Sequence, residues 1–176
     1  MNSTVRIHRS APRGFTIVEL LIVIVIIAIL AAITIVAYNG IRNRAYDSAV
    51  TSDLSSIAKK FELYKIDNTK NLYPGIALSP TLGDFQMSIS KSAYRLDGNA
   101  YNLLNCQLSG GIGYAMIAQS KSGKYFMISS SSTSPSQVTA SVTLTGTSSC
   151  PVIAPGSSAY GAGYNNSTGW RPWTNG

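Results

Sequence analysis

The chain has 176 residues and a formal net charge of +7, with one histidine and two cysteines. This length leaves room for one small domain once an apolar segment near the N-terminus is set aside. Three of the basic residues precede Gly14, so the rest of the chain has 11 basic and 7 acidic residues, a surplus that does not by itself indicate nucleic-acid binding.

Residues 1–14 form a short basic leader with arginines at positions 6, 9 and 13. Under the positive-inside rule these charges favour an orientation with the N-terminus in the cytoplasm and the C-terminus outside. Arg42 and Arg44, on the far side of the apolar segment, weaken this bias. The only histidine, His8, lies in the leader.

From Phe15 to Tyr38 only Thr16, Glu19 and Thr34 are clearly polar. As a helix these 24 residues would be about 36 Å long, against a hydrocarbon core of roughly 30 Å. Half of them are Ile or Val, but a lone segment in lipid must satisfy its backbone internally. The sequence therefore predicts a membrane-spanning helix.

Glu19 is anomalous in this segment, because an acidic side chain inside an apolar span costs about 2.5–3.5 kcal/mol even on permissive scales. No Lys, Arg or His lies between Phe15 and Asn39, so we expect its partner to come from outside this helix. A cut after Gly14 would give Phe15 a free, positively charged amine. The amine of a neighbouring copy would then be a suitable partner.

The run Gly14-Phe15-Thr16-Ile17-Val18-Glu19-Leu20, with the apolar segment after it, resembles the cleavage and methylation segment of type IV prepilins and pseudopilins. The resemblance implies that a prepilin peptidase cuts after Gly14 and methylates Phe15. It also implies that Glu19 pairs with the N-terminus of an adjacent subunit in a helical filament. Many relatives have a proline near the position of Val36, and this span has none.

Two other interpretations of the N-terminal region compete with this one. A secretory signal peptide would have an apolar core of only 7–15 residues and a small-x-small site after it. The apolar run here is longer, and no Ala-x-Ala pattern follows it. A plain single-span anchor would fit the apolar segment but would leave Glu19 and the Gly14–Phe15 junction unexplained.

A second helical pattern follows the span, in which apolar residues recur at intervals of four and three. They form one buried stripe: Val50, Leu54, Ile57, Phe61 and Tyr64. This predicts a helix to about Ile66 that packs on a globular head, with Asn39-Gly40 as its weakest point. Residues 67–91 are expected to form a loop with little regular structure.

The predicted fold is therefore α+β: a long N-terminal helix packed on a small antiparallel β-sheet. The expected domains are the leader (1–14), the membrane-spanning half of the helix (15–39), its amphipathic half (40–66) and the head (67–176). Two hairpins are predicted in the head, one from 93–96 and 100–104 around Asp97-Gly98-Asn99, the other from 112–118 and 125–129. Residues 137–144 are a further candidate strand, and the aromatic tail from Pro151 is expected to stack on the head or on a neighbour.

Cys106 and Cys150 both lie in the part expected outside the cytoplasm, where an oxidising environment favours pairing. A disulfide closing this loop would stabilise the head by about 4 kcal/mol in the chain-entropy model. The alternative is two unrelated buried thiols. Two cysteines without a histidine provide no four-ligand metal site.

The sequence offers little for catalysis, because a processed chain would have no histidine and there is no P-loop or dinucleotide-binding pattern. We expect no cofactor and no enzyme activity. The scattered acids are expected on solvated helix faces and turns: Asp47, Asp53, Asp67, Asp84 and Asp97.

The leading hypothesis is a bacterial type IV pilin, held in the cytoplasmic membrane by a single span and then polymerised by the pilus assembly machinery into a surface filament. A minor pilin, or a pseudopilin of type II secretion or DNA uptake, is the alternative within the family. A membrane-anchored binding or adhesin module is the alternative outside it, in which the aromatic tail or Lys121, Lys124 and Arg171 contact DNA or a surface. Solvated hairpin charges are the preferred explanation of the two lysines.

Overall fold

The computed structural model describes residues 14–74, 87–96, 101–139, 144–165, 169–171 and 174. The chain divides into two units, Met1–Gly40 and Ile41–Gly176, and the helix α1 (Ile17–Asp67) contributes to both. The other elements are η1 (Lys91–Ala93), β1 (Leu103–Leu108), η2 (Ser109–Gly111), β2 (Tyr114–Gln119), β3 (Tyr125–Ser129), β4 (Ser136–Val138), α2 (Gly146–Ile153), β5 (Ser157–Ala162), β6 (Tyr164–Asn165) and β7 (Gly169–Trp170).

The first unit contains the apolar part of α1, where the many β-branched residues form a helix as expected. Its polar Thr34 donates its hydroxyl to the carbonyl oxygens of Leu30 and Ala31, both at 3.0 Å. This hydroxyl is therefore satisfied within the helix itself. Asn39 and Gly40 are helical as well.

In the second unit, α1 buries one face against the sheet. Val50, Leu54, Ile57 and Phe61 are at most 1% exposed, and Tyr64 is partly buried beside them. This confirms the stripe predicted from the sequence. Each such side chain contributes roughly 1.5–3 kcal/mol when fully buried.

The main sheet has five strands in the order β4-β3-β2-β1-β5, and all neighbouring pairs are antiparallel. The β2–β3 pair confirms the second predicted hairpin. Its turn closes with hydrogen bonds from Ser120 N to Lys124 O (2.8 Å) and from Gly123 N to Ser120 O (2.9 Å). Gly123 has a φ of +94°, which an L side chain rarely adopts.

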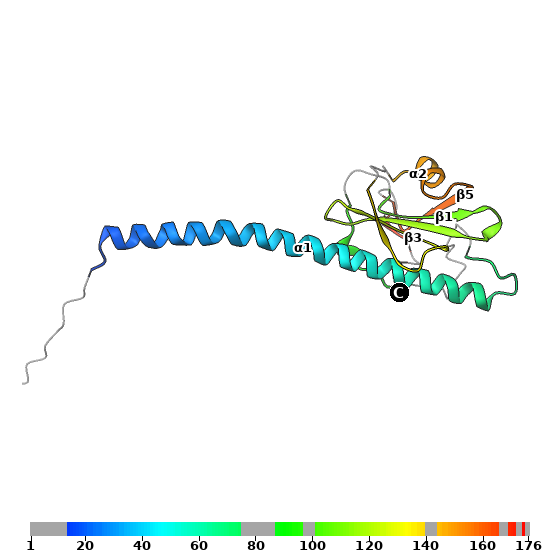
Figure 1. The fold of residues 1–176 in the computed structure, drawn as a ribbon, viewed down its shortest axis with the longest axis horizontal. Coiled ribbons are helices and arrows are strands. Elements are labelled where there is room, and N and C mark those ends of the chain that lie inside the picture. The colour runs from blue at the N-terminus through cyan, green and yellow to red at the C-terminus, as the bar shows by residue number, and fades with distance from the viewer. Residues whose placement is uncertain are drawn as a thin grey trace, which may run out of the picture. The chain divides into compact units, whose positions relative to one another are not determined.

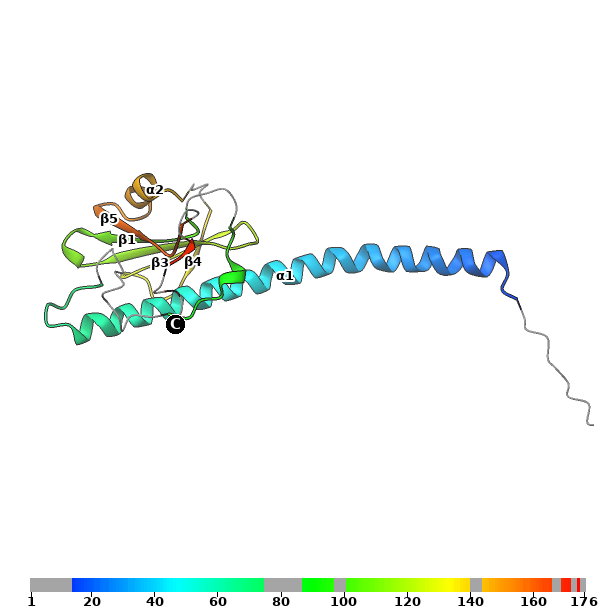
Figure 2. The same ribbon diagram turned by 180° about the vertical axis from the view of Figure 1, so that it is seen from behind.

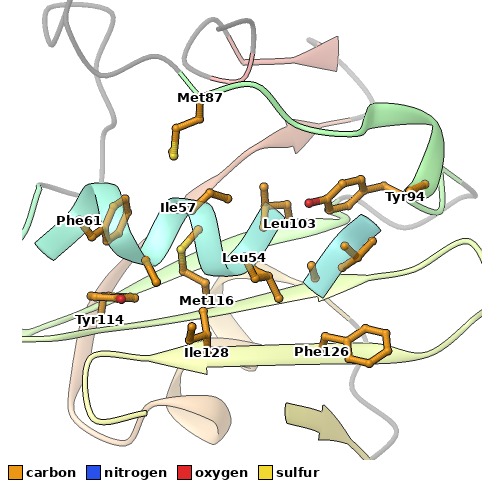
Figure 3. Packing of buried hydrophobic residues seen from close by; sticks show 14 of the residues in the cluster. Leu54, Ile57, Phe61, Met87, Tyr94, Leu103, Tyr114, Met116, Phe126 and Ile128 are labelled. Atoms are coloured by element: carbon orange, nitrogen blue, oxygen red, sulfur yellow. The ribbon is translucent and has the colours of Figure 1, made fainter. Parts of the chain in front are cut away.

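A different helix covers each face of the sheet, α1 on one face and α2 on the other (Figure 1). Because side chains alternate along a strand, neighbours such as Leu103 and Leu104 belong to different cores. Figure 3 shows the α1 side, where side chains of α1 lie over Tyr114, Met116 and Ile128. The opposite core includes Leu104, Cys106, Ala115, Ile117, Leu144, Cys150 and Ala154. This arrangement confirms the α+β prediction.

The first predicted hairpin is wrong. Residues 91–93 form the short helix η1, and Tyr94 makes an isolated bridge to Ser120 instead of pairing with the strand that follows. The segment is held across the end of β2, where Lys121 N donates to Ala93 O (2.7 Å) and Arg95 N donates to Gln119 O (3.1 Å). The expected turn at positions 97–99 lies outside the described residues.

The C-terminal region differs from the prediction as well. Of the predicted strand 137–144, only the first residues are a strand in the described part of the chain, where they belong to β4. Positions 140–143 lie outside the described residues. The tail expected from Pro151 includes the end of α2 and then β5, which pairs with β1. Trp170 stacks edge-on against Tyr94 at 5.5 Å, so this part of the tail packs on its own head.

Candidate processing and assembly segment

The predicted cleavage junction lies just before the first turn of α1. Gly14 and Phe15 are both exposed, Phe15 at 86%, and the helix begins only at Ile17. The peptide bond between them is therefore outside the hydrogen-bonded backbone of the helix. The structure leaves this bond accessible without requiring a helical turn to open.

Glu19 folds back onto the start of its own helix. Its Oε2 accepts hydrogen bonds from the Thr16 amide and from the Thr16 hydroxyl, both at 2.8 Å, and the Glu19 amide donates to Thr16 Oγ1 at 3.2 Å. This reciprocal pattern is a capping box, in which residues three apart satisfy two otherwise free donors at a helix N-terminus. The acidic side chain also lies where the helix dipole is positive.

These contacts correct the expectation that the partner of Glu19 must come from outside the helix. Thr16 supplies two donors from the same helix, although neither carries a charge. The signal was present in the sequence as Thr-x-x-Glu before an apolar run, and the sequence reasoning did not use it. That Glu19 also has a positively charged partner from another subunit stays a prediction.

The apolar half of α1 is exposed along its length. Its large side chains between Phe15 and Tyr38 are between 46% and 86% exposed. The helix is long and apolar enough to cross a membrane. A soluble monomer rarely exposes an apolar surface of this extent, so the segment requires a lipid or protein environment.

The two cysteines form a disulfide that joins β1 to α2. Their Cα atoms are 5.3 Å apart, and Cys106 and Cys150 are 0% and 2% exposed. The pairing expected from the sequence is thus present. It holds the C-terminal helix against the face of the sheet opposite α1.

Two of the acids expected on solvated surfaces have structural contacts instead. Asp53 is only 8% exposed and accepts hydrogen bonds from Ser90 N (2.7 Å), Ser90 Oγ (3.3 Å) and Tyr94 Oη (3.1 Å). Burial raises the pKa of Asp53, while these hydrogen bonds act in the opposite direction. The carboxylate connects α1 to the segment 87–96. Asp67 is exposed as expected, and Asp84 and Asp97 lie outside the described residues.

Asp47 is the second such acid, and it binds one of the candidate DNA-contacting lysines. Lys124 Nζ lies 3.0 Å from Asp47 Oδ2 in an ion pair, and Ser122 donates its hydroxyl to the other carboxylate oxygen. Burial raises the pKa of Asp47, but the hydrogen bonds and the charge of Lys124 outweigh it and lower the pKa overall. Lys121 and Arg171 are exposed, and the structure brings Lys121 close to α1 at Tyr46.

Comparison with known proteins identifies the N-terminal segment. Residues 9–35 match the family model described as the prokaryotic N-terminal methylation motif. The match includes the Gly14–Phe15 junction, Glu19 and most of the apolar segment. No solved structure matches the chain at a significant level.

Relatives extend this similarity beyond the N-terminal segment. The chain is 38% identical over 104 residues to the type IV wide pilus major component PilA4 of Thermus thermophilus, covering 58% of this chain and 79% of that protein. It is 32% identical over 104 residues to the type II secretion system core protein G of Escherichia coli, covering 53% and 72% respectively. The core protein G of Klebsiella michiganensis is 36% identical over 67 residues, 38% of this chain and 46% of that protein. The chain belongs to the family of type IV prepilins and pseudopilins.

Proposed function

We propose that the chain is a structural filament subunit, made as a membrane-anchored precursor that is cut after Gly14. One observation carries the proposal: α1 buries one face of its second half in a head of its own, but the large apolar side chains from Phe15 to Tyr38 are 46–86% exposed. An anchored precursor covers this segment with lipid. A filament covers it with the same segment of neighbouring subunits.

The sequence of events follows from the environment of the N-terminus. In the precursor, residues 1–14 lie on the cytoplasmic side and the head lies outside, as the basic leader favours. A prepilin peptidase cuts the accessible bond before α1 and methylates the new amine of Phe15. The pilus assembly machinery then transfers the subunit from the membrane into the filament.

Glu19 has a specific task in this transfer. In the separate subunit, the two donors of Thr16 satisfy the carboxylate without neutralising it. The amine of Phe15 on an adjacent subunit adds the missing positive charge in an environment of low dielectric, where such a pair is strong. The pair fixes the axial position of one subunit against the next.

We assign the chain to a type IV pilus first, and to a minor pilin or a pseudopilin of type II secretion or DNA uptake as the alternative. The relatives support both, since one is named as the major component of a pilus and others as core proteins of a secretion system. These names describe structural parts, which agrees with a protein that is not an enzyme. Abundance of the chain in fibres sheared from the cell surface would favour a major pilin, and its absence from such fibres would favour the alternatives.

The test of the assembly role compares two substitutions within the apolar segment. Glu19→Ala removes the carboxylate, whereas Thr34→Ala removes a hydroxyl that bonds only to its own helix. Both variants should reach the membrane in normal amounts, because neither adds a charge to the span. Filaments should be lost with Glu19→Ala and kept with Thr34→Ala. Normal filaments from Glu19→Ala would refute the register role.

A further inference from the structure

Basic side chains from three parts of the sequence gather at the end of the head where α1 enters it. They are called the basic cluster here: Arg42, Lys91, Arg95 and Lys121. Arg42 comes from the first turn of α1 after Gly40, Lys91 and Arg95 from η1 and the residues after it, and Lys121 from the β2–β3 turn. In Figure 2, η1 is the short green helix beside α1.

The backbone holds two of these parts together around a hollow of about 380 Å³. Its lining includes Lys91, Arg95 and Lys121, together with Ser92, Tyr94 and Leu96. Main-chain hydrogen bonds join the two sides: Lys121 N donates to Ala93 O and Arg95 N to Gln119 O. Since these bonds do not involve the side chains, the charges are placed by the fold and could be replaced without opening the hollow.

Tyr46 of α1 links the helix to the hollow. Arg42 donates a hydrogen bond to the Tyr46 hydroxyl at 2.7 Å, and Lys121 Nζ lies 5.6 Å from the centre of the same ring. The hydrogen bond from Arg42 lowers the pKa of Tyr46, and the charges of Arg42 and Lys121 add to this effect. The region around Tyr46 is therefore electropositive.

In the segments that carry the cluster, basic residues outnumber acidic ones. Segments 41–53, 87–96 and 120–124 contain six basic and two acidic residues. Of the two acids, Asp47 pairs with Lys124, and Asp53 is buried against Ser90 and Tyr94. Asp97, the next acid in the sequence, lies outside the described residues and would still leave a positive surplus.

The position of the cluster in the chain determines what it can reach. The apolar segment ends at Tyr38, and Arg42 and Tyr46 follow within eight residues, or roughly 12 Å of helix. Beyond the hydrocarbon, the head-group layer on each side of a bilayer is about 5–8 Å thick. Positive charges on the translocated side also run against the positive-inside rule, so their presence here needs a reason.

We propose that the basic cluster binds the phosphate groups of anionic phospholipids in the outer leaflet of the membrane that anchors the subunit. The proposal rests on the membrane-anchored stage of the proposed function and on its orientation. The lipid phosphate would lie against Lys121 and Arg95 at the mouth of the hollow, with Arg42 beside it on α1. Lipid binding would hold the head at the membrane surface until the subunit is transferred to the filament.

The test uses the full chain in detergent micelles that contain equal amounts of phosphatidylglycerol and phosphatidylcholine, with retained lipids counted by native mass spectrometry. The test variant carries Lys91→Gln, Arg95→Gln and Lys121→Gln. The control carries Lys59→Gln, Lys60→Gln and Lys70→Gln, which removes three exposed charges elsewhere. Wild type and control should retain phosphatidylglycerol in preference to phosphatidylcholine. In the test variant the ratio of the two retained lipids should fall at least about fivefold.

Further measurements keep the result interpretable. If the triple variant misfolds, the single change Lys121→Gln and added salt on the wild type should each reduce the preference, because the attraction is electrostatic. Equal retention of both lipids by the wild type would overturn the proposal. So would displacement of the lipid by millimolar inorganic phosphate, which would indicate a site for free anions, or binding of duplex DNA without any lipid preference.

The lipid measurement and the assembly test are independent. Native mass spectrometry requires neither cleavage nor polymerisation, so the Glu19→Ala variant should keep the lipid preference while it loses filaments. Filaments formed normally by a chain without lipid preference would contradict the inference alone. A lipid preference in a chain that is never processed would contradict the filament function alone.

Discussion

Replacing Asp53 with alanine should destabilise the head, because this buried carboxylate connects α1 to the segment 87–96. It accepts hydrogen bonds from the Ser90 amide at 2.7 Å and from the hydroxyl of Tyr94 at 3.1 Å, and Tyr94 is only 2% exposed. Alanine would leave both donors without an acceptor. A buried donor left unsatisfied, here the Tyr94 hydroxyl, costs about 1–3 kcal/mol, and the lost bond of the exposed Ser90 adds about 1 kcal/mol, so we expect a loss of roughly 2–4 kcal/mol. This is a large part of the stability of an ordinary domain.

Asparagine is the matched replacement at this position. With its amide oxygen in the place of Oδ2, it accepts from the Ser90 amide and the Tyr94 hydroxyl, while its NH₂ group donates to Ser90 Oγ. Asp53→Asn should therefore lose much less stability than Asp53→Ala. The two variants separate the loss of hydrogen bonds from the loss of charge.

The dependence on pH has a defined sign. The folded-state pKa of Asp53 lies above the ordinary 3.8, because burial outweighs the hydrogen bonds. Between 3.8 and the folded pKa the folded state binds more protons than the unfolded state, so the contribution of Asp53 to stability falls as pH rises through this window. The stability of Asp53→Asn relative to wild type should accordingly increase from acid to neutral pH.

The assay is urea denaturation of a fragment that starts at Ile41 and contains both hydrophobic cores. Tryptophan fluorescence monitors unfolding, and the measurement is repeated at several pH values. Alanine and asparagine variants of equal stability at pH 7 would refute the hydrogen-bonding argument. A difference between wild type and Asp53→Asn that stays constant with pH would refute the raised pKa.

Two further substitutions test the packing and the ion pair of the head by the same denaturation assay. Phe61→Ala should reduce the free energy of unfolding by about 3–5 kcal/mol, because Phe61 is 0% exposed and stacks edge-on against Tyr114 at 4.7 Å. A loss below about 1 kcal/mol would mean that the packing of α1 does not depend on this core. Lys124→Ala should cost less than about 1 kcal/mol, since Lys124 is half exposed in its pair with Asp47, and the cost should shrink with added salt. Because the pKa of Asp47 is lowered, its contribution to the stability of the head is present above pH 3.8 and is lost as pH falls through the folded-state pKa. A stability loss from Lys124→Ala that does not change in acid would contradict the ion pair.

The features predicted correctly from the sequence are those imposed by burial over many residues. The apolar run from Phe15 to Tyr38 and the stripe from Val50 to Phe61 repeat one signal over several turns, and chance rarely produces such repetition. The β2–β3 hairpin was readable because apolar strands flank a turn containing Gly123. These signals sufficed for the α+β fold.

The features missed depend on single long-range contacts. From the sequence Asp53 has the pattern of a solvated charge, because the residues that donate hydrogen bonds to it, Ser90 and Tyr94, lie 37 and 41 residues away. Main-chain bonds of Ala93 and Arg95 to Lys121 and Gln119 hold the segment 91–96 across the end of β2 and away from the predicted hairpin. The strand β5 was missed because its residues are mostly small and show no apolar alternation, while its pairing with β1 is made by the backbone. At the candidate site, Thr16 was missed although its spacing from Glu19 is a local signal.

The account depends on proteolysis that creates a new amine at Phe15. The most direct test is N-terminal sequencing, with mass analysis, of the mature protein extracted from membranes and from sheared surface material. The account predicts a chain that starts at Phe15 with a methylated amine. Mature protein that still begins at Met1 would contradict it, and would leave Glu19 without the charged partner that assembly requires.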